Sequence, residues 1–227
     1  MNELVLLLGA KGGVGTTAVV VSEARRSPSG TCVTVDLDLV HGDLAHRLGV
    51  AVTTTIADLA PVCRDHVTPS HLAAITYRDA AGVGVVPSPA RAELSELVTP
   101  AAVTALLTAM LATSRVLVDA GSRVDATILA AMRLATTIVL VARPDDVCHT
   151  QLVHLHDLIR RAGVTCDVRL CLPRSRARRA AAMAMSLGVA LWEPANARSI
   201  FGGAGGRFRA VSRRVPAAGP QVVSRHG

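Results

Sequence analysis

The sequence predicts an α/β protein with a doubly wound, mostly parallel β-sheet flanked by helices. Three observations support this prediction. The apolar runs are short and rich in β-branched residues, as in strands buried on both faces. Segments with helical spacing separate these runs, which is the alternation of parallel strands with crossover helices. Aspartates end several of the runs, at the sheet edge where such folds bind ligands.

Six strands and six helices are expected along the chain. The apolar runs place strands near residues 3–9, 31–37, 83–87, 115–119, 136–142 and 166–172. Helical spacing predicts helices at 16–26, 43–48, 100–112, 124–134, 145–162 and 176–187. Several of these helices begin near a threonine, aspartate or serine, whose oxygen can accept hydrogen bonds from the free amides of a first turn.

The chain has 227 residues, of which half are hydrophobic, and this is enough for one domain with a sizeable core. We assign residues 1–195 to that domain and residues 196–227 to a tail rich in glycine and arginine. Pro87–Pro89 also has the composition of a linker. The longest apolar stretches are far shorter than the ~20 residues of a membrane helix. With no secretory signal pattern and no CxxC pair among five cysteines, a cytoplasmic protein is expected.

Charge is distributed unevenly. Residues 1–167 hold 13 basic and 16 acidic side chains, whereas residues 168–227 hold 11 basic and one acidic. A basic C-terminal part could contact DNA or an anionic membrane surface, so that the protein would be peripheral at the inner face of the membrane or at a cell pole. The alternative, which the sequence supports equally well, is a solvated basic tail that binds no partner. Of the 24 basic residues only Lys11 is a lysine, which suggests a position that needs a compact ammonium group.

The strongest motif is the glycine-rich segment GAKGGVGTT at residues 9–17, between the first strand and the first helix. Glycines let successive amides turn toward phosphate oxygens, and a helix N-terminus faces the same anion. The residues expected to bind the nucleotide are Gly12, Gly13, Val14, Gly15, Thr16 and Thr17. The Thr17 hydroxyl is also expected to bind Mg²⁺. A glycine-rich turn that binds nothing is the less favoured interpretation.

This segment resembles the deviant Walker A loop, KGGxGK[ST], of the P-loop ATPases of the MinD/ParA superfamily. The resemblance implies ATP and Mg²⁺ as cofactors and a nucleotide-dependent homodimer. Lys11 matches the signature lysine, which in the family reaches the nucleotide of the partner subunit and is therefore assigned a catalytic role. Two later segments match the family as well. By position, Asp36 corresponds to the aspartate that positions the attacking water, and Asp38 and Asp119 to the aspartates beside the Mg²⁺ ion.

The phrase VDLDLVHGDLAHRLG at residues 35–49 is similar to the CpaE/TadZ branch of this superfamily. That resemblance covers residues 3–162 and implies a positioning factor for the assembly of pili or of type II/IV-like secretion machinery. Two alternatives stay open. One is a nucleotide-independent scaffold of the same fold, and the other is a septum-site regulator or a chromosome or plasmid partition regulator that uses the basic C-terminus.

Two departures from the family pattern bear on catalysis. Thr16 stands where the family has the loop lysine, so a cation that contacts the phosphates is missing. The region of Cys171–Arg174 also lacks the asparagine that the family offers to adenine. Because of Thr16, hydrolysis is expected to be slow or absent. The preference for adenine, and so for ATP, is implied by the resemblance alone.

Overall fold

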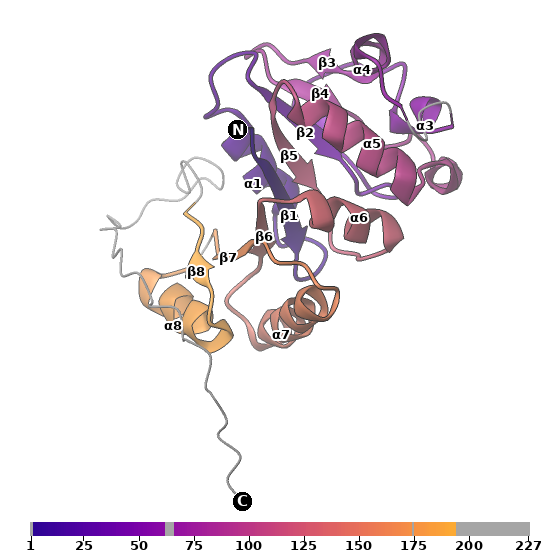
Figure 1. Ribbon diagram of the computed structural model, residues 1–227. Coiled ribbons are helices and arrows are strands. Elements are labelled where there is room, and N and C mark those ends of the chain that lie inside the picture. The colour runs from indigo at the N-terminus through magenta and orange to yellow at the C-terminus, as the bar shows by residue number, and fades with distance from the viewer. Residues whose placement is uncertain (1, 62–65, 174, 194–227) are drawn as a thin grey trace, which may run out of the picture.

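The computed structural model describes residues 2–61, 66–173 and 175–193, and within them one sheet of eight strands (Figure 1). The strand order is β3-β4-β2-β5-β1-β6-β7-β8. The strands are β1 (Leu4–Gly9), β2 (Cys32–Asp36), β3 (Tyr77–Arg78), β4 (Gly84–Val86), β5 (Arg115–Asp119), β6 (Thr137–Val141), β7 (Asp167–Cys171) and β8 (Ala190–Leu191). Among the strands that the structure describes, only β3 and β4 pair antiparallel. The predicted mostly parallel sheet is confirmed.

Helices cover both faces of this sheet. They are α1 (Thr16–Ala24), α2 (Leu44–Arg47), α3 (Ile56–Leu59), α4 (Pro69–Ile75), the 3₁₀ helix η1 (Ala92–Leu97), α5 (Pro100–Leu111), α6 (Ala126–Leu134), α7 (Asp146–Arg161) and α8 (Ala177–Leu187). Figure 1 shows α1 on one side of the central strands and α5 and α6 on the other. The crossover from β1 to β2 moves along the sheet toward β3, whereas the crossover from β5 to β6 moves toward β8. Because such crossovers are right-handed, the helices of these two connections lie on opposite faces of the sheet.

The centre of the sheet is β1, whose residues Leu4–Leu8 are completely buried between β5 and β6. The register fixes what lies at its carboxyl end. Leu7 is opposite Asp119 of β5, and Gly9 is opposite Val141 of β6. The loop that leaves β1 therefore begins between the ends of β5 and β6.

The structure adds elements that the sequence pattern did not predict. They are the short α3, α4, η1, β3 and β8, none of which is long enough to display a periodic apolar pattern. Local capping signals were present, since Thr55 accepts from the Ala57 amide and Thr68 from the His71 amide. The expectation of a linker at Pro87–Pro89 was wrong. Pro87 and Ser88 are buried, and the Pro87 carbonyl accepts a hydrogen bond from the Ile56 amide.

The expected basic tail, residues 196–227, lies outside the described residues. Four cysteines that the structure describes, Cys32, Cys148, Cys166 and Cys171, are free thiols, and three of them are buried. Within the described ranges, no helix combines the length and the apolar character needed to span a bilayer.

Candidate phosphate-binding site

The segment from Lys11 to Thr17 forms a loop at the carboxyl edge of the sheet. Gly13 and Gly15 have φ angles of 76° and 102°, left-handed conformations that glycine adopts without strain. At Gly12 and Gly13 an added Cβ atom would meet nothing within 4 Å, so open space lies beside the loop. No side chain caps the N-terminus of α1, which leaves the first amides of the helix available to an anion.

Neighbouring strands anchor the start of this loop. The Gly9 amide donates to the carbonyl of Gly121 at 2.7 Å, and the Ala10 amide donates to the carbonyl of Val141 at 2.8 Å. An added Cβ at Gly9 would lie 2.6 Å from the Thr16 hydroxyl, so glycine is required there. The loop is thus held on one flank by the end of β5 and on the other by the end of β6.

The β5 flank carries a buried hydroxyl–carboxylate contact. Asp119, which ends β5, is only 1% exposed and accepts a hydrogen bond from the Thr17 side chain. A second bond comes from the Gly121 amide at 3.1 Å. Burial raises the pKa of Asp119 to about 6, although both hydrogen bonds favour the charged form. The two oxygen groups expected to lie beside Mg²⁺ are therefore next to each other.

Asp36 ends β2 directly opposite Asp119 in the sheet register. Its carboxylate accepts hydrogen bonds from the Asp38 amide at 3.2 Å, the Leu44 amide at 3.1 Å and the Ser88 hydroxyl at 3.3 Å. Burial, and then the charge of Asp119, raise its pKa well above the ordinary value. The carboxylate expected to position water is thus enclosed by its own loop. Sequence reasoning missed Ser88, whose hydroxyl helps to enclose it.

Asp38 is the more accessible aspartate of the pair, with 28% of its side chain exposed. It accepts a hydrogen bond from the His41 amide, and it packs so closely on Gly121 that an added Cβ there would lie 2.4 Å from its Oδ2. Asp38 also lines a cleft of about 200 Å³ together with Glu96 and Arg123.

The structure thus brings Asp36, Asp38 and Asp119 together at one edge of the sheet. In the described part of the chain, no group of three or more His, Cys, Asp or Glu side chains could hold a metal ion by itself. This is compatible with Mg²⁺, which is usually held by one or two carboxylates together with substrate phosphates and water.

The β6 flank carries the positive charges. The Lys11 ammonium lies 3.8 Å from Asp145, and about 40% of each side chain is exposed. Asp145 caps α7 by accepting from the Cys148 amide at 2.8 Å; this bond, and then the charge of Lys11, lower its pKa. Arg143, to which sequence reasoning gave no role, donates to the Gly13 carbonyl at 2.6 Å.

Thr16 does not join this group of charges. It is 7% exposed, and its hydroxyl lies beneath the loop, close to Gly9. Because the side chain is short, neutral and turned inward, no cation extends from position 16 to the open side of the loop.

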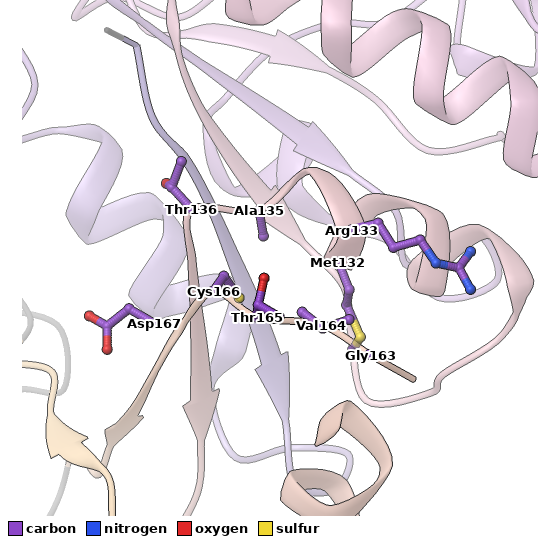
Figure 2. Close-up of a pocket in the computed structure, with 9 residues that line it drawn as sticks. All are labelled: Met132, Arg133, Ala135, Thr136, Gly163, Val164, Thr165, Cys166 and Asp167. Atoms are coloured by element: carbon purple, nitrogen blue, oxygen red, sulfur yellow. The ribbon is translucent and has the colours of Figure 1, made fainter. Parts of the chain in front are cut away.

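A separate cavity of about 580 Å³ lies between the amino ends of β6 and β7, lined by Thr136, Cys166 and Asp167 among others (Figure 2). Arg133 is at its rim. Parallel α/β sheets bind ligands at the carboxyl ends of their strands, and this cavity is at the opposite ends. It is therefore distinct from the glycine loop.

A glycine loop between the first strand and its helix, beside a strand-ending aspartate, is the arrangement of the P-loop fold. Solved structures agree. The chain is similar to a ParA family ATPase from Chlorobium tepidum, with 18% identity, a TM-score of 0.73, and 84% of this chain and 82% of that chain covered. It is also similar to the septum site-determining protein MinD from Pyrococcus horikoshii in complex with Mg-ADP, with 22% identity and a TM-score of 0.67 over 84% and 79% of the two chains.

The same fold occurs in a metabolic enzyme. Cobyrinic acid a,c-diamide synthase from Mycobacterium smegmatis, solved with an ATP analogue and magnesium, is 18% identical with a TM-score of 0.61, over 83% of this chain and 82% of that chain. No protein-family description and no curated protein matches the sequence. The comparisons therefore establish the fold, which proteins of different activity share.

Proposed function

We propose that this chain binds Mg-ATP at the loop of residues 11–17 and acts as a slow nucleotide-dependent switch that positions a larger assembly. The observation that carries the proposal is the contact between Thr17 and Asp119 at the base of an open glycine loop. It places the hydroxyl and the carboxylate side by side, where a hard cation bound to phosphates needs oxygen ligands.

The residues present fit this group. Open space beside Gly12 and Gly13 can accept phosphate oxygens, and the amides of residues 12–17 supply the donors. Thr17, Asp38 and Asp119 would hold Mg²⁺, which supplies charge stabilisation of the phosphates when bound. Lys11 is 40% exposed, so it is free to leave Asp145 for the nucleotide of a second subunit. Exposed ion pairs of this kind contribute little stability.

Hydrolysis should be slow or absent for two reasons. Thr16 is buried and brings no positive charge to the phosphates, and such charge is a large part of the catalytic effect in phosphoryl transfer. In addition, Asp36 is enclosed beneath residues 38–44, so its carboxylate reaches water only when this loop opens.

Exposed apolar side chains support a dimer through the carboxyl edge of the sheet. Val40, Leu97 and Val147 are 42%, 43% and 60% exposed, and each belongs to a segment that follows the carboxyl end of a strand. Val40 lines the same cleft as Asp38, and Val147 lies two residues after Asp145, the partner of Lys11. Bound nucleotide between two subunits would bury these apolar side chains together with Lys11.

The proposed cargo is the assembly machinery of pili or of a type II/IV-like secretion system. Its support is the resemblance of residues 35–49 to the CpaE/TadZ branch. In the structure this segment contains Asp36 and Asp38 and ends at the turn after α2, so it lies directly at the proposed switch.

Size-exclusion chromatography with light scattering, with and without Mg-ATP, tests this function. We expect a monomer without nucleotide and a dimer with Mg-ATP, and we expect Lys11→Ala to bind nucleotide but to remain monomeric. Arg133→Ala, at the remote cavity, is the matched control and should behave like the original chain. Folded protein that neither binds Mg-ATP nor changes its mass would contradict the proposal.

A scaffold that has lost nucleotide dependence is the second candidate, and the buried Thr16 favours it. Calorimetric titration separates the two. A slow switch binds Mg-ATP with an affinity that falls when Mg²⁺ is removed, whereas a scaffold shows no such binding and yet keeps its protein partners.

A further inference from the structure

The loop lacks its usual lysine, and a neighbouring segment brings a different cation to it. Because β6 lies next to β1, with Gly9 opposite Val141, the chain that leaves β6 runs beside the glycine loop. Two residues after the end of β6, Arg143 donates from Nη2 to the carbonyl of Gly13 at 2.6 Å. The topology therefore fixes a guanidinium at the rim of the loop.

Arg143 forms no salt bridge in the described part of the chain, although its charge helps to lower the pKa of Asp145. Asp145 itself already accepts from the Cys148 amide and pairs with Lys11. Arg143 is exposed, and open space lies beside Gly12 and next to Gly13, whose carbonyl the guanidinium contacts.

We infer that Arg143 is the phosphate-binding cation of this loop, in the role that Thr16 leaves vacant. This inference rests on the proposed function. The guanidinium would exchange a bond to a neutral carbonyl for bonds to charged phosphate oxygens. Charge-assisted bonds are roughly twice as strong as neutral ones, and the planar fork of arginine can bind two oxygens at once.

The positions of the two flanks support this assignment. Thr17 and Asp119 lie on the β5 side of the loop, and Arg143 and Lys11 lie on the β6 side. A polyphosphate in the loop would thus have its metal-binding groups on one side and the Arg143 guanidinium on the other, while Lys11 serves the nucleotide of the second subunit. In the family, the cation that contacts the phosphates comes from the first turn of the helix after the loop. Here it would come from Arg143, in the segment before α7.

Isothermal titration with Mg-ATP, Mg-ADP and AMP tests the inference on the full chain. Arg143→Ala should weaken Mg-ATP binding by about tenfold or more, the loss expected for one hydrogen-bonded charge. The loss should be smaller for Mg-ADP and absent for AMP, which has no β- or γ-phosphate. Arg143→Lys should restore part of the affinity. Arg133→Ala should leave all three affinities unchanged.

A rescue experiment excludes a merely structural effect. Thr16→Lys should raise Mg-ATP affinity much more in the Arg143→Ala background than in the original chain, because the two cations would serve the same phosphates. Equal gains in both backgrounds, or Arg143→Ala binding within about twofold of the original chain, would overturn the inference while leaving the proposed function intact. No Mg-ATP binding by the original chain would overturn both.

Discussion

Two buried carboxyl groups, Asp36 and Asp119, lie opposite each other on adjacent strands, and neither forms a salt bridge with a residue that the structure describes. In water each would be ionised at neutral pH. Burial instead raises the pKa of both carboxyl groups, assisted at Asp36 by the charge of Asp119 and at Asp119 by the charge of Asp38, so the pair stores unfavourable free energy that a bound divalent cation would relieve.

The first prediction concerns the pH dependence of stability. The pKa of Asp119 is about 6 in the folded protein and 3.8 in the unfolded chain. Between these two pH values the folded protein keeps a proton on Asp119 that the unfolded chain has released. Stability without ligand should therefore fall as pH rises through about 4 to 6, with the full penalty above that range. Asp119→Asn should raise the free energy of unfolding at pH 7.5 by about 2 kcal/mol, and by less at pH 5.

Urea unfolding at both pH values measures this effect, with Asp157→Asn as the exposed control. Parallel pH profiles for the original chain and Asp119→Asn would show that the buried carboxyl does not retain its proton.

The second prediction concerns the tight contact at Gly42. A Cβ atom at this position would lie 2.1 Å from the Ser88 hydroxyl and 2.5 Å from Oδ2 of Asp36. Gly42→Ala must therefore push the loop off Asp36, and should lower the free energy of unfolding by about 1–3 kcal/mol in chemical denaturation. Gly12→Ala is the matched control, because its added methyl meets nothing within 4 Å. If the two variants were equally stable, the close packing of Gly42 on Asp36 and Ser88 would not contribute to stability as predicted.

At the scale of elements, capping decides where the helices around the site begin. Asp125 accepts from the amides of Thr127 at 2.9 Å and Ile128 at 3.0 Å at the start of α6, the helix that follows the Asp119 strand. Asp125→Ala should lower the free energy of unfolding by about 1 kcal/mol, and Asp125→Asn, which keeps an acceptor, by much less. Thermal unfolding of both variants checks this, and identical losses would show that the cap bonds are not the cause.

The long elements could be predicted from the sequence because each repeats one pattern over several residues. The run of Leu4–Leu8 and the amphipathic α7 are examples. The two-residue strands β3 and β8 could not be, since their existence depends on pairing with strands already in place.

The site shows the same division. The aspartates at 36, 38 and 119 could be predicted to meet, because parallel strands share one carboxyl edge. Three features could not be predicted: the enclosure of Asp36, the inward position of Thr16 and the contact of Arg143 with Gly13. Each depends on atoms from segments distant in sequence, and no local pattern encodes their distances.

At the scale of the whole molecule, the uneven charge yields a further prediction. Residues 207–227 contain five arginines and no acidic residue. If this segment contacts an anionic surface, its deletion should abolish cosedimentation with DNA or with anionic liposomes, and that binding should weaken steeply with salt. Binding that survives the deletion would assign the contact to another part of the molecule.

The isolation of Lys11 has a practical consequence. A chain with a single lysine offers amine-directed reagents one side-chain target, and here that target sits on the glycine loop with 40% of its surface accessible. A fluorophore or crosslinker attached there reports on this loop alone, apart from any label on the terminal amine. Shielding of that one ammonium from the reagent by a nucleotide, or by a second subunit, would register as a change in mass of a single peptide.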